Sequence, residues 1–229
     1  MIGSPNDNRP VREMPPAEQT RAALVHAALK LFGRNGFDGT STRAIAAEAK
    51  ANIGSIAYHF GGKEGLRLAA ADHIVETIRA VAATAFGDPG AEVPADPEAA
   101  RAQLFTALER MVSFVVARPE AGEIVQFVLR ELTQPTPALD VIYQGLFEPA
   151  HRRLCALWES ATGEAAESER VRLTVFTLVG QAVYFRIARA GVLRRMGWSD
   201  IGAAEAAAIA AVARANLEAI LTARKGGTA

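Results

Sequence analysis

The segment from Thr40 to Lys63 constrains the fold of this chain more than any other part of it. It reads TSTRAIAAEAKANIGSIAYHFGGK and divides into two short helical stretches, about 42–49 and 52–59, with a tight turn between them. Thr40 or Ser41 can cap the first stretch, because a side-chain hydroxyl accepts a hydrogen bond from a free helix N–H group. Lys63 then opens a longer helix. Two short helices joined in this way are typical of a helix-turn-helix.

Helical periodicity continues through the rest of the chain, and no period-two strand pattern interrupts it. The first helix is predicted over 16–35 and ends at Gly36, a residue suited to a left-handed stop. Its apolar stripe has the i, i+3, i+4, i+7, i+8 spacing of an amphipathic helix and consists of Leu24, Ala27, Ala28, Leu31 and Phe32. Further helices are predicted from Lys63 to before Gly87 and over 98–117, 119–133, 138–162, 166–195 and 203–224. The fold class expected is therefore all-α.

These elements predict an N-terminal three-helix domain and a C-terminal helical bundle. The N-terminal domain is expected over 16–77, with the helix-turn-helix at about 41–60, and the ligand-binding and dimerisation domain over 78–224. The Gly- and Pro-rich stretch 87–97 is the clearest internal loop. Residues 1–15 are expected to form a disordered arm, and residues 225–229 a frayed tail.

Composition excludes several classes of protein. Lys and Arg number 25, as do Asp and Glu, so the formal net charge is zero and nucleic-acid binding requires a local basic patch. No apolar run reaches the ~20 residues that span a membrane, and the N-terminus lacks the apolar core of a signal peptide. The single cysteine, Cys155, excludes an internal disulfide. We therefore expect a cytoplasmic protein with no membrane partner.

The second helix of the motif presents small and polar groups at its N-terminal end, where a recognition helix contacts base edges. Asn52 can pair with adenine, and an exposed Ile53 can contact a thymine methyl group. Gly54 allows close approach, and Ser55 can donate or accept a hydrogen bond. Arg43, at the start of the preceding helix, can reach a base edge or a phosphate.

Contacts to the DNA backbone are separable from base reading. Thr42 lies near a helix N-terminus, whose free N–H groups suit a phosphate. Tyr58 and His59 project a hydroxyl and an imidazole along the strand. Lys63 in a first helical turn opposes the helix dipole by roughly 0.3–1 kcal/mol, and a bound phosphate would reverse that sign. The alternative is a small bundle with a solvated polar face, which the combined spacing disfavours.

Residues 17–77 resemble the DNA-binding domain of TetR-family transcriptional regulators. The pattern is LFxxxGFxGTSTRxIA over 31–46, followed by YHFxxKExL over 58–66. The resemblance implies base-facing positions for Arg43, Asn52, Ile53, Gly54 and Ala57. It implies phosphate contacts for Thr42, Ser55, Tyr58, His59 and Lys63. One position departs from the family, because Lys50 stands in the turn where a glycine is usual. Either Lys50 adopts a left-handed conformation, or the turn differs, or Lys50 contacts phosphate.

The C-terminal half resembles the CecR branch of that family over most of residues 120–200. The segments that carry the resemblance are LRELTQPTPA at 129–138, FEPAH at 147–151, LVGQAVYFR at 178–186 and the Gly-Trp pair at 197–198. This resemblance implies repression of efflux or membrane-transport genes and a link to antibiotic or xenobiotic sensitivity.

The last two predicted helices, 166–195 and 203–224, are apolar on more than one face. In the first of them, one stripe consists of Val171, Val175, Leu178 and Ala182, and off it lie Leu173, Phe176, Val183 and Ile187. A helix that is apolar all round is covered on several sides. An antiparallel pair of this kind predicts a homodimer built through a four-helix bundle. Ordinary core packing is the alternative.

Six polar residues interrupt the apolar C-terminal helices and are candidates for an effector pocket between helices. They are Gln126, Arg130, His151, Gln181, Tyr184 and Arg186. Alternatively they bond to each other or across the dimer, with Arg130 and Arg186 free to pair with Glu131 and Glu148. His151 and Cys155 stand four apart, but two ligands alone do not make a metal site. No metal or cofactor is expected, and Asp72 and His73 are expected to form a packing or capping pair.

Together these features predict a dimeric, ligand-responsive transcriptional repressor. Its partners would be a pseudo-palindromic double-stranded DNA operator and a small-molecule effector that releases the protein from it. The sequence shows no catalytic cluster, so an enzyme is not expected. The alternative function is an all-helical protein-interaction module that retains the fold without sequence-specific DNA binding.

Overall fold

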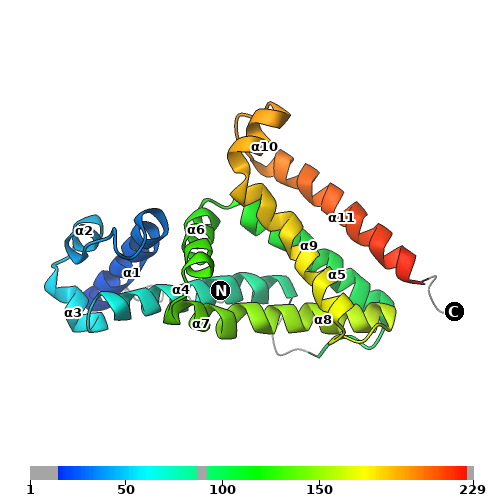
Figure 1. The fold of residues 1–229 in the computed structure, drawn as a ribbon, viewed down its shortest axis with the longest axis horizontal. Coiled ribbons are helices and arrows are strands. Elements are labelled where there is room, and N and C mark those ends of the chain that lie inside the picture. Colours follow the sequence, from blue (N-terminus) through cyan, green and yellow to red (C-terminus); the bar gives the residue numbers. More distant parts are fainter. Residues whose placement is uncertain (1–14, 87–91, 226–229) are drawn as a thin grey trace, which may run out of the picture.

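The computed structural model describes residues 15–86 and 92–225, and its regular secondary structure in these ranges is helical. The predicted arm over 1–15 and the predicted tail over 225–229 lie outside the described ranges except for Pro15 and Lys225. Residues 87–91 of the predicted loop also lie outside them. The expected all-α class is confirmed for the described residues (Figure 1).

The N-terminal part contains four helices close to the predicted positions. They are α1 (Pro16–Asn35), α2 (Thr42–Glu48), α3 (Gly54–Phe60) and α4 (Lys63–Phe86). The Ser41 hydroxyl caps α2 by accepting a hydrogen bond from the Ala44 N–H at 3.1 Å. Thr40 is buried and points the other way, with its hydroxyl donating to the Gly36 carbonyl at 2.7 Å. Thr40 thus closes the loop after α1, and Ser41 starts α2.

The C-terminal part contains α-helices and two π-helical turns. They are α5 (Pro97–Val112), η1 (Ser113–Ala117), α6 (Pro119–Thr133), α7 (Pro137–Ile142), η2 (Tyr143–Phe147), α8 (Glu148–Thr162), α9 (Glu169–Ile187), α10 (Arg189–Met196) and α11 (Ala203–Lys225). In Figure 1, α2 and α3 lie at one end of the molecule, while α9 and α11 form two sides of a triangle at the other. Proline stands in the first turn of α1, α5, α6 and α7, where its missing N–H has no helical partner.

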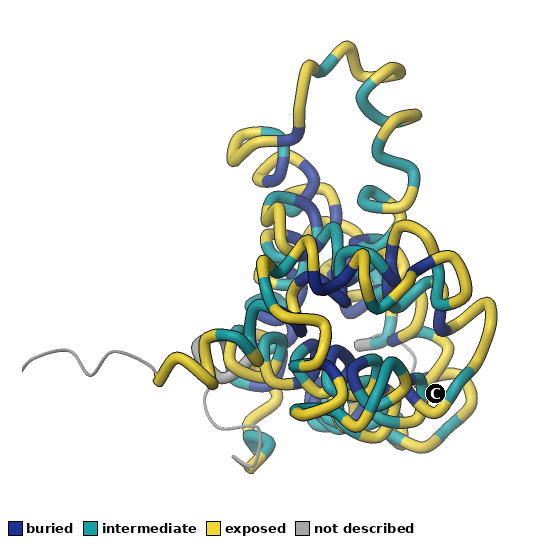
Figure 2. Tube along the Cα trace, turned by 90° about the vertical axis from the view of Figure 1, so that its left-hand side faces the viewer, coloured by how far each residue is buried: buried dark blue, intermediate teal, exposed yellow. Residues whose placement is uncertain are grey.

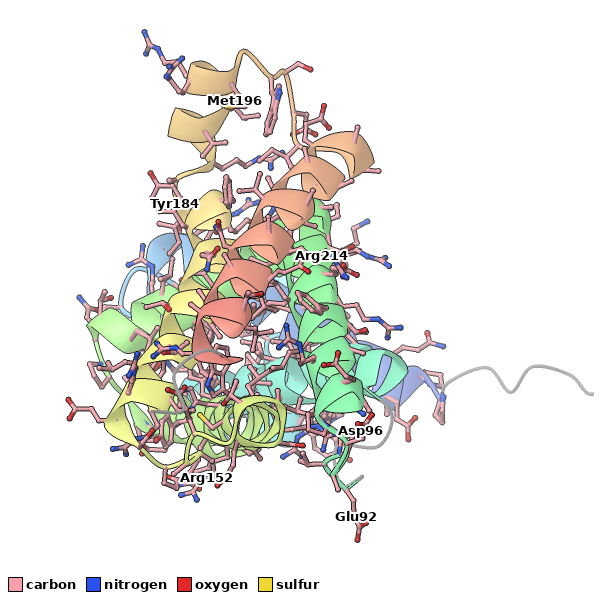
Figure 3. The ribbon with its side chains drawn as sticks, turned by 90° about the vertical axis from the view of Figure 1, so that its right-hand side faces the viewer. Glu92, Asp96, Arg152, Tyr184, Met196 and Arg214 are labelled. Carbon is pink, nitrogen blue, oxygen red and sulfur yellow. The ribbon has the colours of Figure 1, made fainter. Side chains whose placement is uncertain are left out.

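The prediction of a single helix over 166–195 is wrong. The chain bends by 77° between α9 and α10, around Ala188. Long-range polar contacts hold both sides of this bend: Arg186 bonds to the start of α6, and Arg189 forms an ion pair with Asp200 in the loop before α11. Tertiary contacts therefore override a local sequence that contains no helix breaker at the bend. In Figure 3 the tip of α10, marked by Met196, stands out from the bundle.

Buried side chains form two hydrophobic cores. The first contains apolar residues of α1 to α4, and it also takes in Ile124 and Phe127 of α6 with Ala138 and Ile142 of α7. The second joins α5, α8, α9 and α11 around Trp158, whose Nε1 donates to Glu164 Oε2 at 2.9 Å. Figure 2 shows the buried segments where helices face one another. The first core thus extends across residue 77, where the sequence places a domain boundary.

Helices α1 and α6 approach one another closely at Gly33. A Cβ atom at Gly33 would lie 3.2 Å from the Phe127 nitrogen and 3.3 Å from the Gln126 Cβ. Protein interiors are packed as densely as organic crystals, so such a position tolerates little added volume. The packing of α6 on the N-terminal helices therefore depends on a residue without a side chain.

By length and composition, the stretch Ala203–Arg224 of α11 could cross a membrane, and the bent pair α9–α10 would pass the same test together. This is weak evidence for a span, because core helices of folded bundles pass the same test. In this structure Ile209, Ala213, Leu217 and Leu221 of α11 are buried in the second core. Helix α11 therefore packs as a core helix along one of its faces.

Candidate nucleic-acid interface

Helix α3 divides into a buried face and an exposed face. Ile56 is 1% exposed and lies in the first core, with Phe60 packed against it. On the other face Ile53 is 49% exposed and Tyr58 is 83% exposed. An isoleucine and a tyrosine that remain this open on a small helix are available to a partner molecule.

Asn52 has a structural role that the sequence did not indicate. Its Oδ1 accepts a hydrogen bond from the Gly54 N–H at 2.8 Å, and α3 begins at Gly54, two residues later than predicted. Asn52 therefore caps the helix start and satisfies one of its free N–H groups. The Nδ2 group of Asn52 can still donate, so base contact and helix capping use different atoms of the same amide.

The backbone conformation of Lys50 shows how the turn accommodates a lysine where the family usually has a glycine. Its φ angle is 52°, which confirms the left-handed conformation, and it is the sole non-glycine residue with positive φ in the described ranges. The Ala51 N–H bonds to the Ala46 carbonyl at 2.9 Å, and the Lys50 N–H bonds to the Ala47 carbonyl at 3.1 Å. This pair of bonds is a Schellman motif, which ends a helix tightly. The turn therefore keeps its geometry with a lysine, at some conformational cost.

Lys63 and His59 also border the exposed face of α3. Lys63 is half-buried at the start of α4, with its Nζ 4.0 Å from the centre of the Phe37 ring. His59 is half-buried and meets the Tyr58 ring edge-to-face at 4.9 Å between centroids. The remaining candidates from the sequence lie on α2 and α3: Arg43 and Ala57 are exposed, and Thr42 and Ser55 are half-buried.

Glu48, the last residue of α2, forms an ion pair with a lysine of α1. Lys30 of α1 forms an ion pair with Glu48, and that contact lowers the pKa of the Glu48 carboxyl. Pairing offsets a negative charge that would otherwise oppose a polyanion. The arrangement leaves Arg43, Lys50 and Lys63 as basic groups around α2 and α3.

Two pocket candidates, Gln126 and Arg130, lie on α6 where it packs against α1. Arg130 Nε donates to the Gly33 carbonyl and its Nη2 to the Arg34 carbonyl, both at 2.8 Å. Arg130 thus satisfies carbonyl groups in the last turn of α1, which a cation also stabilises through the helix dipole. The alternative pairing of Arg130 with Glu131 is wrong, because Glu131 pairs with Arg67, and these contacts of Arg130 do not support a pocket role.

Glu131 binds a different arginine, and sequence reasoning missed this pair. Its side chain is 1% exposed and accepts from Arg67 Nε of α4 at 2.8 Å and from the Thr136 hydroxyl at 2.5 Å. A buried carboxylate requires such partners. The available signal was the position of Glu131 within an amphipathic helix, where a charged residue faces the apolar side.

Arg186 is also a structural residue. It donates from Nη2 to the Arg118 and Pro119 carbonyls at 3.2 and 3.1 Å, and burial lowers the pKa of its guanidinium. Gly122 leaves room for it, because a Cβ there would lie 2.3 Å from Arg186 Nη2. The alternative pairing of Arg186 with Glu148 is wrong, since Glu148 pairs with Arg152 at 2.9 Å.

His151 joins α8 to α9. Its Nε2 donates to the Arg172 carbonyl at 3.1 Å, so Nδ1 accepts, at 3.6 Å, from the Cys155 thiol. The ring stacks on Phe176 with centroids 4.1 Å apart. Burial raises the pKa of the Cys155 thiol, which keeps it protonated and unreactive. Across residues 15–86 and 92–225, no cluster of three metal-ligating side chains forms.

The pairing expected between Asp72 and His73 is wrong. His73 Nε2 lies 3.1 Å from His26 Nε2, which connects α4 to α1, and Asp72 is exposed. Burial and then the neighbouring His26 lower the pKa of His73. The contact joins two helices of the first core instead of neighbours on one helix.

Gln181 and Tyr184 line an open groove between α9 and α11. Gln181 Oε1 accepts from Asn216 Nδ2 of α11 at 2.9 Å, and Tyr184 is 62% exposed. Figure 3 shows Tyr184 near the upper end of α9. Further apolar side chains on these helices are also exposed, namely Leu173, Phe176, Ile187 and Val212. The outer face of α9 and α11 is therefore an apolar surface.

Comparison with known proteins agrees with this arrangement. Residues 24–70 match the sequence profile of bacterial regulatory proteins of the tetR family. Residues 100–224 match the profile of the C-terminal domain of the HTH-type transcriptional dual regulator CecR. The CecR protein of Shigella flexneri is 34% identical over 189 residues, which cover 80% of this chain and 82% of that protein.

Solved structures share the fold at low sequence identity. A transcriptional regulator from Pseudomonas aeruginosa PAO1 is 19% identical, with a TM-score of 0.67, over 94% of this chain and 97% of that one. AibR, solved in complex with isovaleryl coenzyme A and operator DNA, is 15% identical with a TM-score of 0.63. The match to AibR covers 86% of this chain and 97% of that one.

The fold and the helix-turn-helix define a DNA-binding transcriptional regulator, not an enzyme. The chain belongs to the TetR family. Within that family its C-terminal domain is of the CecR type.

Proposed function

We propose that this chain is a homodimeric repressor that binds a pseudo-palindromic DNA operator and releases it when a small molecule binds. The observation that carries the proposal is the exposed N-terminal end of α3 at one extremity of the molecule (Figure 1). In this proposal α3 enters the major groove, and the other groups of α2, α3 and α4 contact the backbone.

Within this proposal the ten site residues fall into two sets. The base-facing set is Arg43, Asn52, Ile53, Gly54 and Ala57. The phosphate-contacting set is Thr42, Ser55, Tyr58, His59 and Lys63. The first set provides sequence preference, and the second provides affinity that depends on salt concentration.

The dimer interface is proposed to be the apolar outer face of α9 and α11. Phe176 is 61% exposed and Leu173 is 56% exposed on a single chain, and both lie outside the groove that Gln181 and Tyr184 line. Two such helix pairs related by a two-fold axis would bury these side chains in a four-helix bundle. A two-fold dimer matches a pseudo-palindrome with half-sites ~34–36 Å apart, or a longer multiple.

The effector is proposed to bind the C-terminal domain. Gln181 and Tyr184 line the groove between α9 and α11, so these two of the six predicted residues are kept as candidates. AibR, which shares the fold, was solved with a coenzyme A thioester and DNA together. The CecR-type domain favours efflux or membrane-transport genes as targets, and a DNA-binding regulator of this kind would act in the cytoplasm.

A salt titration of binding to mixed-sequence and promoter DNA tests the proposal against the interaction-module alternative. With ~4 phosphate contacts per subunit, the dimer should give a log–log slope of roughly −7. Selection of bound duplexes from a random pool should yield an inverted repeat. A weak response with no dependence on salt and no enriched sequence would favour the interaction module.

Leu173→Glu tests the dimer interface, because it places a charge on the exposed apolar face of α9. The variant should sediment as a monomer and bind operator DNA weakly. Leu132→Glu on α6 is the matched control, since Leu132 is similarly exposed at 50% but lies outside that face. Equal effects of the two variants on assembly would contradict the proposed interface.

Gln181→Leu tests the effector site. It removes the acceptor for Asn216 in the groove and should change the DNA release caused by antibiotics or acyl-coenzyme A compounds, without changing DNA affinity in their absence. A change in the sedimentation of the variant would place Gln181 at the dimer interface instead.

A further inference from the structure

Phe37 lies between α1 and α2, where two cations of α4 share its ring. Lys63 Nζ lies 4.0 Å from the ring centroid, and the guanidinium carbon of Arg67 lies 4.5 Å from it. Phe32 holds the ring from the core side, with centroids 5.4 Å apart. Phe37 is part of the family pattern, but no role in DNA binding was predicted for it.

Lys63 requires a partner at this position. It is half-buried in the first turn of α4, where the helix dipole opposes a positive charge. Among residues 15–86 and 92–225, no carboxylate forms an ion pair with its ammonium group. The face of an aromatic ring attracts a cation through its quadrupole, so Phe37 supplies the stabilisation that a carboxylate would otherwise give.

An aromatic ring and a carboxylate differ in how far they leave the ammonium group free to bind a phosphate. An ammonium group has three N–H donors, and a ring face does not neutralise its charge. Lys63 can therefore rest on Phe37 and still present donors and full charge to a phosphate. A carboxylate partner would compete with that phosphate.

Arg67, the second cation on the ring, is held in place by a residue of the C-terminal half. Arg67 donates to Glu131 of α6 at 2.8 Å, and its charge is thereby compensated. Lys63 and Arg67 are four residues apart, a spacing at which like charges on a helix repel. Compensation of Arg67 by Glu131 leaves Lys63 as the uncompensated cation on the ring.

We propose that Phe37 is a positioning residue for the phosphate contact of Lys63. The inference rests on the proposed DNA-binding function and deepens it. Phe37 itself does not contact DNA. It fixes the ammonium group in advance, so that less side-chain freedom is lost when the phosphate binds.

A double-mutant cycle tests this role, with a mixed-sequence DNA duplex as the probe. Phe37→Leu should weaken binding by about threefold per subunit, and so by about tenfold for a dimer. It should also flatten the salt slope towards that of Lys63→Ala. In the Lys63→Ala background, Phe37→Leu should have no further effect. Phe37→Tyr keeps the ring and should bind as the unmodified protein does.

A merely structural role predicts a different result. Phe37→Leu would then weaken binding equally in both backgrounds, in proportion to the fall in melting temperature, and leave the salt slope unchanged. That outcome would overturn the inference even if Lys63→Ala weakens binding as expected. Failure of the unmodified protein to bind any duplex would instead contradict the proposed function. Melting temperatures of all variants show whether each one folds.

Discussion

Arg67 Nε and Nη2 both lie 2.8 Å from the same oxygen of Glu131. The contact joins α4, which begins at the candidate interface, to α6 of the C-terminal half. The second Glu131 oxygen accepts from Thr136 at 2.5 Å, so both oxygens of this buried carboxylate are bonded. A polar contact between distant parts of the chain therefore helps to hold α4 against α6.

Removing the carboxylate should be strongly destabilising, because Arg67 would be left partly buried without its partner. Glu131→Ala is expected to lower the free energy of unfolding by about 3–5 kcal/mol, measured by urea denaturation. Glu148→Ala is the control, since it breaks the exposed pair with Arg152 and should change stability by less than about 1 kcal/mol. Similar losses in the two variants would show that the Glu131 pair contributes no more than a surface contact.

Lys50→Gly should stabilise the protein. A left-handed conformation costs a residue with a Cβ about 1–2 kcal/mol, and glycine offsets part of that gain through its greater freedom in the unfolded chain. We expect a net gain of about 0.5–1 kcal/mol in thermal or urea unfolding.

Lys50→Ala separates backbone strain from charge at the same position. It keeps the Cβ, so its stability should stay close to that of the unmodified protein. If Lys50 contacts a phosphate, both variants should lose DNA affinity equally and flatten the salt slope by about 1 per subunit. Unchanged affinity in both would show that Lys50 does not contact the backbone.

Stability should fall in mild acid because of His73. Burial and the nearby His26 lower its folded pKa below the ordinary value of 6.5, while Glu76 partly opposes that shift. The unfolded chain then binds more protons than the native state, so the free energy of unfolding falls as pH drops below about 6.5.

Urea denaturation across pH 5–8 measures that dependence. His73→Gln should flatten it. His26→Gln removes the neighbouring charge but not the burial, and should give an intermediate dependence. A dependence on pH that is identical in all three proteins would contradict the assignment to His73.

Asn52 should be tested with two substitutions, because it caps α3 and is also proposed to face a base. Asn52→Ala removes the cap and should cost about 1 kcal/mol of stability. Asn52→Ser keeps a capping oxygen but loses the reach of the amide, so its stability should be retained. Both variants should relax preference at one base pair by roughly 1–3 kcal/mol, measured by competition between selected duplexes. Unaltered base preference in Asn52→Ser would restrict Asn52 to a structural role.

The sequence predicted the features that local chemistry determines. The bounds of α1 follow from neighbouring residues, and the structure confirms them. Where local chemistry left alternatives open, the structure selects Ser41 over Thr40 as the cap of α2 and the left-handed conformation for Lys50.

Features that depend on distant parts of the chain could not be predicted in this way. Arg130 and Arg186 interrupt apolar stretches as pocket residues do, but each binds backbone carbonyls of another helix. The bend at Ala188 likewise depends on partners far along the chain. Phe37 and Lys63 are far apart in the sequence and come into contact only in the folded chain.

The first core determines which segments must be kept together when a chimera is made from two regulators of this type. Ile124, Phe127, Ala138 and Ile142 complete the interior of the N-terminal helices, although all four lie beyond α5 in the sequence. A chimera joined at residue 77 would pair the head of one relative with the α6 and α7 of another, and would mismatch this interior. The transferable unit is therefore discontinuous: residues 16–77 together with 119–142.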